Sequence, residues 1–252
     1  MTRIALITGG NRGLGRAAAR ALAEDGTDVV VTYRSHAEEA AAVVAELAAA
    51  GRTATALRLD TSDHDSFAAF AGELRNQLRE RWDRENFDIL VNNAGFEGVT
   101  PFGETDAATM DALYGVHVRG PVLLTELLAP MINDGGRILF VSTGLTRYAA
   151  NPVYSVYAAM KGAVEIYTKY AAKALGPRAI TVNVLAPGAT GTDFGGGVIR
   201  DDEAYRARVL TNHAFGRIGE PEDIGAAVCA VVSERASWIT AQRIEASGGQ
   251  SL

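Results

Sequence analysis

Tyr157 and Lys161 lie four residues apart, a spacing that places two side chains on one face of a helix. A phenol with a pKa of about 10 is a poor acid–base group at neutral pH, but a close ammonium favours the phenolate and lowers that pKa. The pair therefore predicts a proton-transfer site with Tyr157 as the acid–base residue. A surface tyrosine beside a solvated lysine is the alternative interpretation.

A glycine-rich segment follows the apolar run 4–7, and a helical stretch begins near Arg16. Its sequence is Thr8-Gly9-Gly10-Asn11-Arg12-Gly13-Leu14-Gly15. Glycines at 9, 13 and 15 let the backbone approach a pyrophosphate, and the amides of the following helix point at the anion. We predict a dinucleotide-binding loop that includes Asn11, Arg12 and Leu14. Because the spacing differs from G-x-G-x-x-G, a plain tight turn is the alternative.

The end of the second predicted strand indicates which dinucleotide binds. An NAD site places a carboxylate there for the ribose 2′-hydroxyl, but residues 31–35 are Val-Thr-Tyr-Arg-Ser. Arg34, together with Arg12, would instead bind a 2′-phosphate, which favours NADP(H) over NAD(H). Both arginines would otherwise be solvated surface charges. Asp60 and Thr61 follow the third strand, where Asp60 would accept from the adenine amino group or simply form a turn.

Short apolar runs alternate with longer Ala-rich stretches along the chain. The runs predict strands over 4–7, 28–31, 55–59, 88–91, 137–141, 181–185 and 240–244. The stretches predict helices over 13–26, 36–51, 63–83, 106–133, 152–176, 201–212 and 221–232. Such alternation is typical of a parallel sheet covered on both faces. We expect one doubly wound Rossmann-type α/β domain over 1–252, with a cofactor half of about 1–135 and a catalytic half of about 136–252.

Composition excludes several classes of protein. The formal net charge is −6 and no basic patch is evident, so nucleic acid is not an expected partner. The single cysteine, Cys229, lies in the apolar run 226–232 and is interpreted as buried packing; neither it nor His36, His64 and His213 has metal-ligand spacing. No run reaches the roughly 18 apolar residues of a membrane helix, and no targeting segment is evident. We expect a cytoplasmic protein.

Four motifs occur in a recognisable order: the glycine-rich loop, Asn92-Asn93-Ala94-Gly95 after the fourth predicted strand, Tyr157 with Lys161, and Pro187-Gly188 after the sixth. In this combination the chain closely resembles the short-chain dehydrogenase/reductase family. The resemblance covers essentially the whole chain. It is strongest to the branch of 3-oxoacyl-carrier-protein reductases and related NADPH-dependent carbonyl reductases.

The resemblance implies a role for each motif residue. Tyr157 would donate a proton to the carbonyl oxygen, and Lys161 would lower its pKa and bind the nicotinamide ribose. The adenosine ribose and the central strands would be supported by Asn92, Ala94 and Gly95, and the nicotinamide would be bordered by Pro187, Gly188, Thr190 and Thr192. The family is usually tetrameric, which implies a homotetramer that packs the helices predicted around 106–133 and 152–176.

Two positions depart from the family pattern. The family places a serine after the fifth strand, where this chain has Ser142-Thr143; strand register favours Thr143 as the hydroxyl that polarises the carbonyl, and Ser142 is the alternative. His117 stands where the family commonly has an asparagine that maintains a proton relay. His117 would hold a water and alter the pH dependence, or would simply be packed and hydrogen-bonded.

The segment 189–217, with three consecutive glycines at 195–197, is expected to close over the substrate as a lid. Phe96, Tyr148 and Tyr154 are candidate pocket walls. The leading hypothesis is an NADP(H)-dependent oxidoreductase acting on a carbonyl or secondary alcohol, with 3-oxoacyl thioesters as one substrate class. Reductases of steroids, quinones or sugars are a related alternative, and a non-catalytic dinucleotide-binding redox sensor is an alternative of a different class.

Overall fold

Seven short strands form one parallel sheet in the computed structural model, which describes residues 2–252. The strands are β1 (Ile4–Ile7), β2 (Asp28–Tyr33), β3 (Ala54–Arg58), β4 (Phe87–Asn92), β5 (Ile132–Val141), β6 (Thr181–Pro187) and β7 (Arg243–Ala246). Their order in the sheet is β3-β2-β1-β4-β5-β6-β7. The strand order reverses between β1 and β4, and in such sheets the ligand crevice opens there, beyond the carboxyl ends of the strands.

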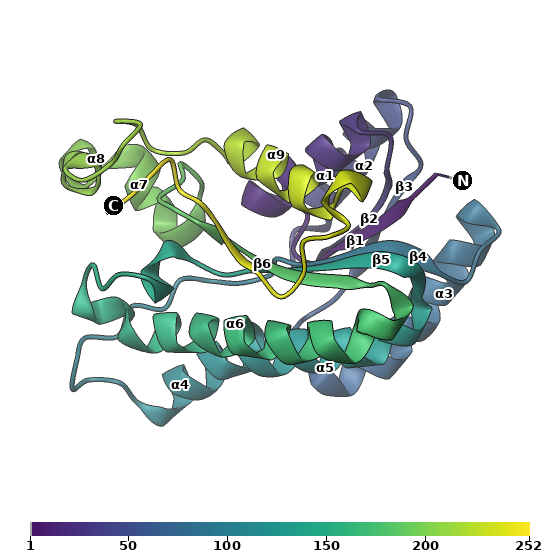
Figure 1. Ribbon diagram of the computed structural model, residues 1–252, viewed down its shortest axis with the longest axis horizontal. Coiled ribbons are helices and arrows are strands. Elements are labelled where there is room, and N and C mark those ends of the chain that lie inside the picture. The colour runs from purple at the N-terminus through teal and green to yellow at the C-terminus, as the bar shows by residue number, and fades with distance from the viewer. Residues whose placement is uncertain (1) are drawn as a thin grey trace.

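Helices cover both faces of this sheet (Figure 1). They are α1 (Gly13–Glu24), α2 (Ala37–Ala49), α3 (Phe67–Trp82), α4 (Ala107–Tyr114), α5 (Gly120–Leu128), α6 (Ser155–Leu175), α7 (Val198–Asp201), α8 (Glu203–Leu210) and α9 (Pro221–Val232). The predicted doubly wound Rossmann-type fold is therefore confirmed.

Alternation along each strand divides the core into two layers. In β1, Ile4 and Leu6 pack with α3, α5 and α6, whereas Ala5 and Ile7 pack with α1, α2 and α9. Both sides of the strand are buried, which explains why the strands are apolar at almost every position. Gly225 permits the closest approach of α9 to α1, because a Cβ there would lie 2.5 Å from the Ala17 carbonyl oxygen.

Several boundaries differ from the sequence prediction. The helix expected over 106–133 is divided by a π-helical turn, Gly115–Arg119, and its end at 132–133 belongs to β5. Gly120, after that turn, lies so close to the Thr61 carbonyl that a Cβ would overlap it, a tertiary contact that local pattern does not reveal. The helix expected over 201–212 is instead α7 and α8.

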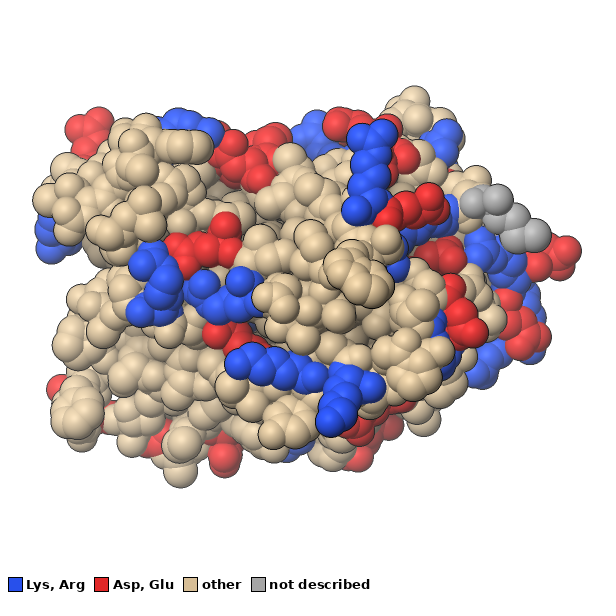
Figure 2. Space-filling model, in the orientation of Figure 1, with Lys and Arg blue, Asp and Glu red and all other residues tan. Residues whose placement is uncertain are grey.

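The last strand begins at Arg243 rather than at 240, because Ala241 has a left-handed φ of 60°. Cys229, on α9, is half-buried rather than buried, and it packs against the core layer that α1, α2 and α9 cover. Acidic and basic side chains are interspersed over the face of the molecule shown in Figure 2. Within residues 2–252, none of the helices has the length and apolar character needed to cross a bilayer.

Candidate active site

One cavity of about 380 Å³ lies at the carboxyl ends of the strands. The loops after β1 to β6 all contribute to its wall, as expected for the crevice of this fold. The predicted site residues that line it are Gly9, Asn11, Arg12, Gly13, Leu14, Arg34, Asp60, Thr61, Ala94, Gly95, Ser142, Thr143, Tyr157, Lys161, Pro187, Gly188, Thr190 and Thr192. The candidate wall residues Phe96, Tyr148 and Tyr154 line it as well.

The glycine-rich loop presents the N-terminus of α1 to this cavity. No side chain caps that helix end and its first turn holds no acidic residue. Gly9 and Gly13 have left-handed φ values of 64° and 54°. Gly15 does not line the cavity; a Cβ there would overlap the Gly9 carbonyl oxygen, so Gly15 is needed for the loop to fold back on itself.

Asn92 does not line the cavity either. Its side chain is buried and donates to Thr125 Oγ1 at 3.0 Å, so it fastens β4 to α5. The neighbouring Asn93 faces the cavity and its Nδ2 donates to the carbonyl oxygens of Thr8 at 2.9 Å and Gly9 at 3.2 Å. Asn93, which the sequence reasoning did not select, thus holds the glycine-rich loop in place. Because side chains at the end of a strand alternate in direction, only one of Asn92 and Asn93 can point toward the glycine-rich loop.

Tyr157 and Lys161 lie on α6 and both are buried. Lys161 Nζ donates to the Val141 carbonyl oxygen at 2.7 Å and lies 5.8 Å from the centre of the Tyr157 ring. Burial lowers the pKa of Lys161 to about 8, so the ammonium is the main form at neutral pH.

The expected lowering of the Tyr157 pKa does not occur in this structure. Burial raises the pKa of Tyr157, and the carboxylate of Glu97 raises it further. The phenol is desolvated and faces a negative charge, and both effects favour its protonated form. Tyr157 therefore retains its proton at neutral pH.

His117 lies in the π-helical turn and is buried directly behind Tyr157, outside the cavity wall. Its ring stands edge-on to the Tyr157 ring with centres 5.3 Å apart. Nε2 lies 2.9 Å from the Phe96 carbonyl oxygen, to which it donates. Burial, with the charge of Lys161, lowers the pKa of His117 to about 3, so the imidazole is neutral and its Nδ1 is an acceptor. Nδ1 is buried and has no protein partner within residues 2–252.

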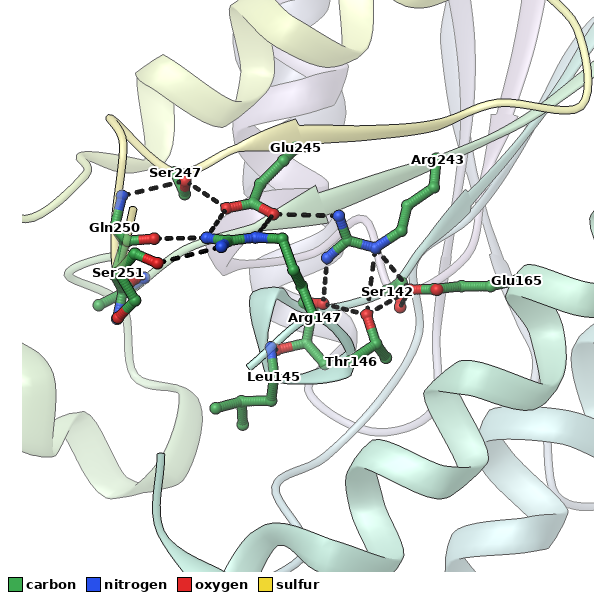
Figure 3. A network of polar contacts seen from close by, with 12 residues as sticks. Ser142, Leu145, Thr146, Arg147, Glu165, Arg243, Glu245, Ser247, Gln250 and Ser251 are labelled. Atoms are coloured by element: carbon green, nitrogen blue, oxygen red, sulfur yellow. Dashed lines mark hydrogen bonds and ion pairs between the residues drawn. The ribbon is translucent and has the colours of Figure 1, made fainter. Parts of the chain in front are cut away.

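The two candidate hydroxyls after β5 have different surroundings, and Figure 3 shows Ser142 beside Glu165. Ser142 Oγ is buried and donates to Glu165 Oε1 at 2.6 Å. Thr143 Oγ1 accepts from the Leu145 amide at 3.3 Å, which leaves its proton available. Arg243 donates to the Thr143 carbonyl oxygen at 3.1 Å and fixes this loop. The geometry therefore favours Thr143 as the hydroxyl that faces a substrate.

The segment predicted to be a lid approaches Tyr157 through Phe194, whose ring centre lies 6.3 Å from that of Tyr157. Gly195, Gly196 and Gly197 all have left-handed φ values, between 64° and 80°, which only glycine adopts readily. Besides Asn93, the polar lining residues that the sequence did not single out for the site include Glu97, Tyr205 and Gln250. No local motif marks them, because each comes from a loop or a surface helix.

Comparison with known proteins agrees with this arrangement. Residues 9–251 match the family model described as enoyl-(acyl carrier protein) reductase. The 3-oxoacyl-[acyl-carrier-protein] reductase of Staphylococcus aureus is 32% identical over 254 residues, covering 100% of this chain and 99% of that protein. The chain belongs to the short-chain dehydrogenase/reductase family.

Two solved structures of reductases are close to this family member. The promiscuous reductase LugOII, which catalyses keto-reduction at C1 during lugdunomycin biosynthesis, has a TM-score of 0.92 and 36% identity, covering 98% of this chain and 96% of that one. The angucycline C-6 ketoreductase LanV, solved with bound NADP, has a TM-score of 0.92 and 35% identity, covering 98% and 95%.

The donor set of this short-chain dehydrogenase/reductase fits a phosphorylated dinucleotide. The uncapped amides of α1 face the cavity. Gly13 has no side chain there, and a Cβ at this residue would lie 4.0 Å from Thr192 Cβ and occupy the space between them. Arg12 and Arg34 are exposed at the cavity edge and supply positive charge. Burial acts against ionisation of Asp60, but hydrogen bonds from Ser62 and the nearby arginines outweigh it and lower the Asp60 pKa. Asp60 also forms the predicted turn, accepting from the Ser62 amide at 2.9 Å.

Proposed function

We propose that this protein is an NADP(H)-dependent oxidoreductase that transfers a hydride between the nicotinamide and a carbonyl or secondary alcohol. The observation that carries the proposal is the meeting of Tyr157, Lys161 and Thr143 in the same cavity as an uncapped, glycine-rich helix N-terminus. When bound, NADP(H) supplies or accepts the hydride.

The side chains of the chain itself manage the proton. Tyr157 retains its proton at neutral pH because burial raises its pKa, so it is a proton donor for the oxygen of a carbonyl under reduction. Thr143 donates a second hydrogen bond to that oxygen, which stabilises the negative charge that develops on it. Lys161 holds a positive charge beneath Tyr157 and stabilises the phenolate left after proton donation.

We assign His117 a positioning role. Its neutral ring stands against Tyr157 and carries a buried acceptor, Nδ1, that has no partner among residues 2–252. A water that donates a hydrogen bond to Nδ1 would be held there, and it would pass a proton taken from solvent toward Tyr157 after the phenol has donated its own. Since the pKa of His117 is about 3, the ring stays neutral over the working pH range and does not itself take up that proton.

The preference for NADP(H) is supported by the two arginines at the cavity edge and by the absence of an acidic residue in 31–35. A guanidinium pairs with a phosphate through two parallel hydrogen bonds. The ketoreductase LanV, similar over almost its whole length, was solved with NADP.

A panel of ketones, followed by NADPH absorbance with NADH as control, tests this function. We expect turnover of at least one ketone, formation of the corresponding alcohol, and a loss of kcat of at least about 10²-fold in Tyr157→Phe with cofactor affinity retained. Near-normal turnover by that variant would refute the role of Tyr157. Stoichiometric NADPH binding without turnover of any ketone would instead support the redox-sensor function.

We also propose that the protein is a homotetramer, with α5 and α6 at subunit contacts. Leu123 and Leu127 on α5 and Ile166 and Tyr170 on α6 are apolar and exposed. Apolar side chains gathered on neighbouring helices are typical of subunit interfaces. Light scattering should give four times the chain mass of 26.6 kDa; a monomer at micromolar concentration would exclude the tetramer.

A further inference from the structure

Glu97 is a carboxylate in the cavity that none of the steps above uses. It lies in the loop after β4, is half-buried, and lines the same cavity as Tyr157. Its Oε1 accepts a hydrogen bond from Tyr154 at 3.1 Å, and the Tyr154 hydroxyl lies 3.5 Å from that of Tyr205. Three segments distant in sequence, the β4 loop, the turn before α6 and helix α8, thus bring polar groups together on the substrate side.

The charge of Glu97 is not neutralised by the protein. No lysine, arginine or histidine among residues 2–252 forms an ion pair with it. Its field reaches both neighbouring phenols: after burial, which is the main cause, Glu97 contributes to the raised pKa of Tyr157 and of Tyr154. An uncompensated carboxylate in the same cavity as the reacting hydroxyl affects any substrate that binds there.

The lid holds Glu97 from the other side. Gly195 has a left-handed φ of 64°, and a Cβ at this residue would overlap the Glu97 carboxylate. The carboxylate therefore sits between Tyr154 and the lid backbone. Because Tyr154 occupies Oε1 only, lone pairs of the carboxylate remain to accept a further hydrogen bond.

Aromatic side chains make up much of the remaining wall on this side. Phe96, Tyr148 and Phe194 line the cavity together with Tyr154 and Tyr205. Such a wall suits a flat, apolar ring system, and one acceptor in an otherwise apolar site fixes the orientation of its ligand.

We propose that Glu97, held by Tyr154, is a specificity residue that accepts a hydrogen bond from a hydroxyl group of an uncharged aromatic ketone and discriminates against anionic ketones. The inference rests on the proposed reductase function and names the substrate class of the same site. A hydroxyl that reaches the carboxylate forms a charge-assisted hydrogen bond, whereas a carboxylate on the substrate meets a like charge at low solvent exposure. Sites built to hydrogen-bond a substrate hydroxyl reject analogues that lack it.

Binding is measured by calorimetry on the enzyme saturated with NADP⁺, so that the readout does not require turnover. The probes are 1-tetralone, its 5-, 6- and 7-hydroxy derivatives and the corresponding carboxylates. The proteins are wild type, Glu97→Gln and, as a matched control, Glu104→Gln, which changes an exposed glutamate outside the cavity wall. Reduction of 1-tetralone by NADPH is measured in parallel.

For wild type we expect at least one hydroxytetralone to bind about tenfold more tightly than 1-tetralone, and each carboxylate to bind at least about tenfold more weakly. In Glu97→Gln both differences should shrink at least about fivefold, and in Glu104→Gln they should stay as in wild type. The inference is overturned if no hydroxytetralone binds more tightly than 1-tetralone, or if Glu97→Gln retains the wild-type ratios. If the affinity ratios depend on Glu97 but no ketone is reduced, the reductase function alone is refuted. If 1-tetralone is reduced but the affinity ratios do not depend on Glu97, the specificity role alone is refuted.

Discussion

Replacement of Glu245 by glutamine removes one charge from the polar network in Figure 3. Glu245 accepts from Arg147 through two parallel hydrogen bonds of 2.7 and 2.8 Å, from Arg243 at 3.0 Å and from Ser247 at 2.8 Å. Its side chain is only 18% exposed. Arg147 also donates to the Gln250 and Ser251 carbonyl oxygens, so the network fastens the C-terminal segment to the loop after β5.

The magnitude follows from the pKa of Glu245. The hydrogen bonds from Arg147 are the main cause that lowers this pKa from 4.5 to about 2. At about 1.4 kcal/mol per pH unit, this difference corresponds to about 3 kcal/mol of stabilisation. Because Arg147 is partly exposed and solvent screens the pair, we expect Glu245→Gln to lower the free energy of unfolding by about 2 to 3 kcal/mol at pH 7.

The sign of the pH dependence is fixed by the direction of the pKa change. A carboxylate whose pKa is lowered by folding stabilises the folded state fully above its unfolded pKa of 4.5, and this stabilisation is lost as the pH falls toward about 2. The difference between wild type and Glu245→Gln should therefore decrease to less than about half by pH 3.

Urea unfolding followed by circular dichroism at pH 7, 5, 4 and 3 measures this difference, with Glu104→Gln as the exposed control. The control should stay within about 0.5 kcal/mol of wild type. The reasoning is refuted if Glu245→Gln costs less than about 1 kcal/mol at pH 7, or if its effect is the same at pH 7 and pH 3.

Three further predictions test other parts of the structure. Arg34→Ala should weaken NADPH binding at least about tenfold more than NADH binding by fluorescence titration, and equal losses would remove the argument for a 2′-phosphate site. His117→Asn keeps a polar group at this position and should lower kcat less than about tenfold. Any inflection near pH 8 in the rate profile should stay unchanged in this variant, because it belongs to Lys161 and not to the neutral His117. Loss of that inflection would contradict the assignment of a neutral imidazole. Gly225→Ala should lower the free energy of unfolding in urea by about 1 to 3 kcal/mol, because its Cβ would overlap the Ala17 carbonyl. As a control, Gly162→Ala has open space around its Cβ and should be neutral or stabilising by up to about 1 kcal/mol. Equal effects of the two variants would show that α1 and α9 are not in tight contact.

The sequence by itself determined the sheet, most of its strands and the outline of the site. Near-continuous apolar strands separated by amphipathic stretches specify a parallel sheet with two covered faces, because the spacing of apolar residues within a segment indicates its secondary structure and the faces it buries. The sequence also predicted the glycine-rich loop and the pair of Tyr157 and Lys161. Both depend on local spacing, along one loop or one helix, and not on contacts with distant segments.

The tertiary structure decided everything that depends on contacts between distant segments. Both Ser142 and Thr143 line the cavity, but the Ser142 hydroxyl is already bonded to Glu165 on α6. The Asn92 side chain is likewise bonded to Thr125 on α5. The sequence pattern predicted a lowered pKa for Tyr157, but packing buries the phenol and brings Glu97 toward it. Desolvation and the field of a distant residue depend on how the whole chain packs, so no spacing within one helix can reveal them.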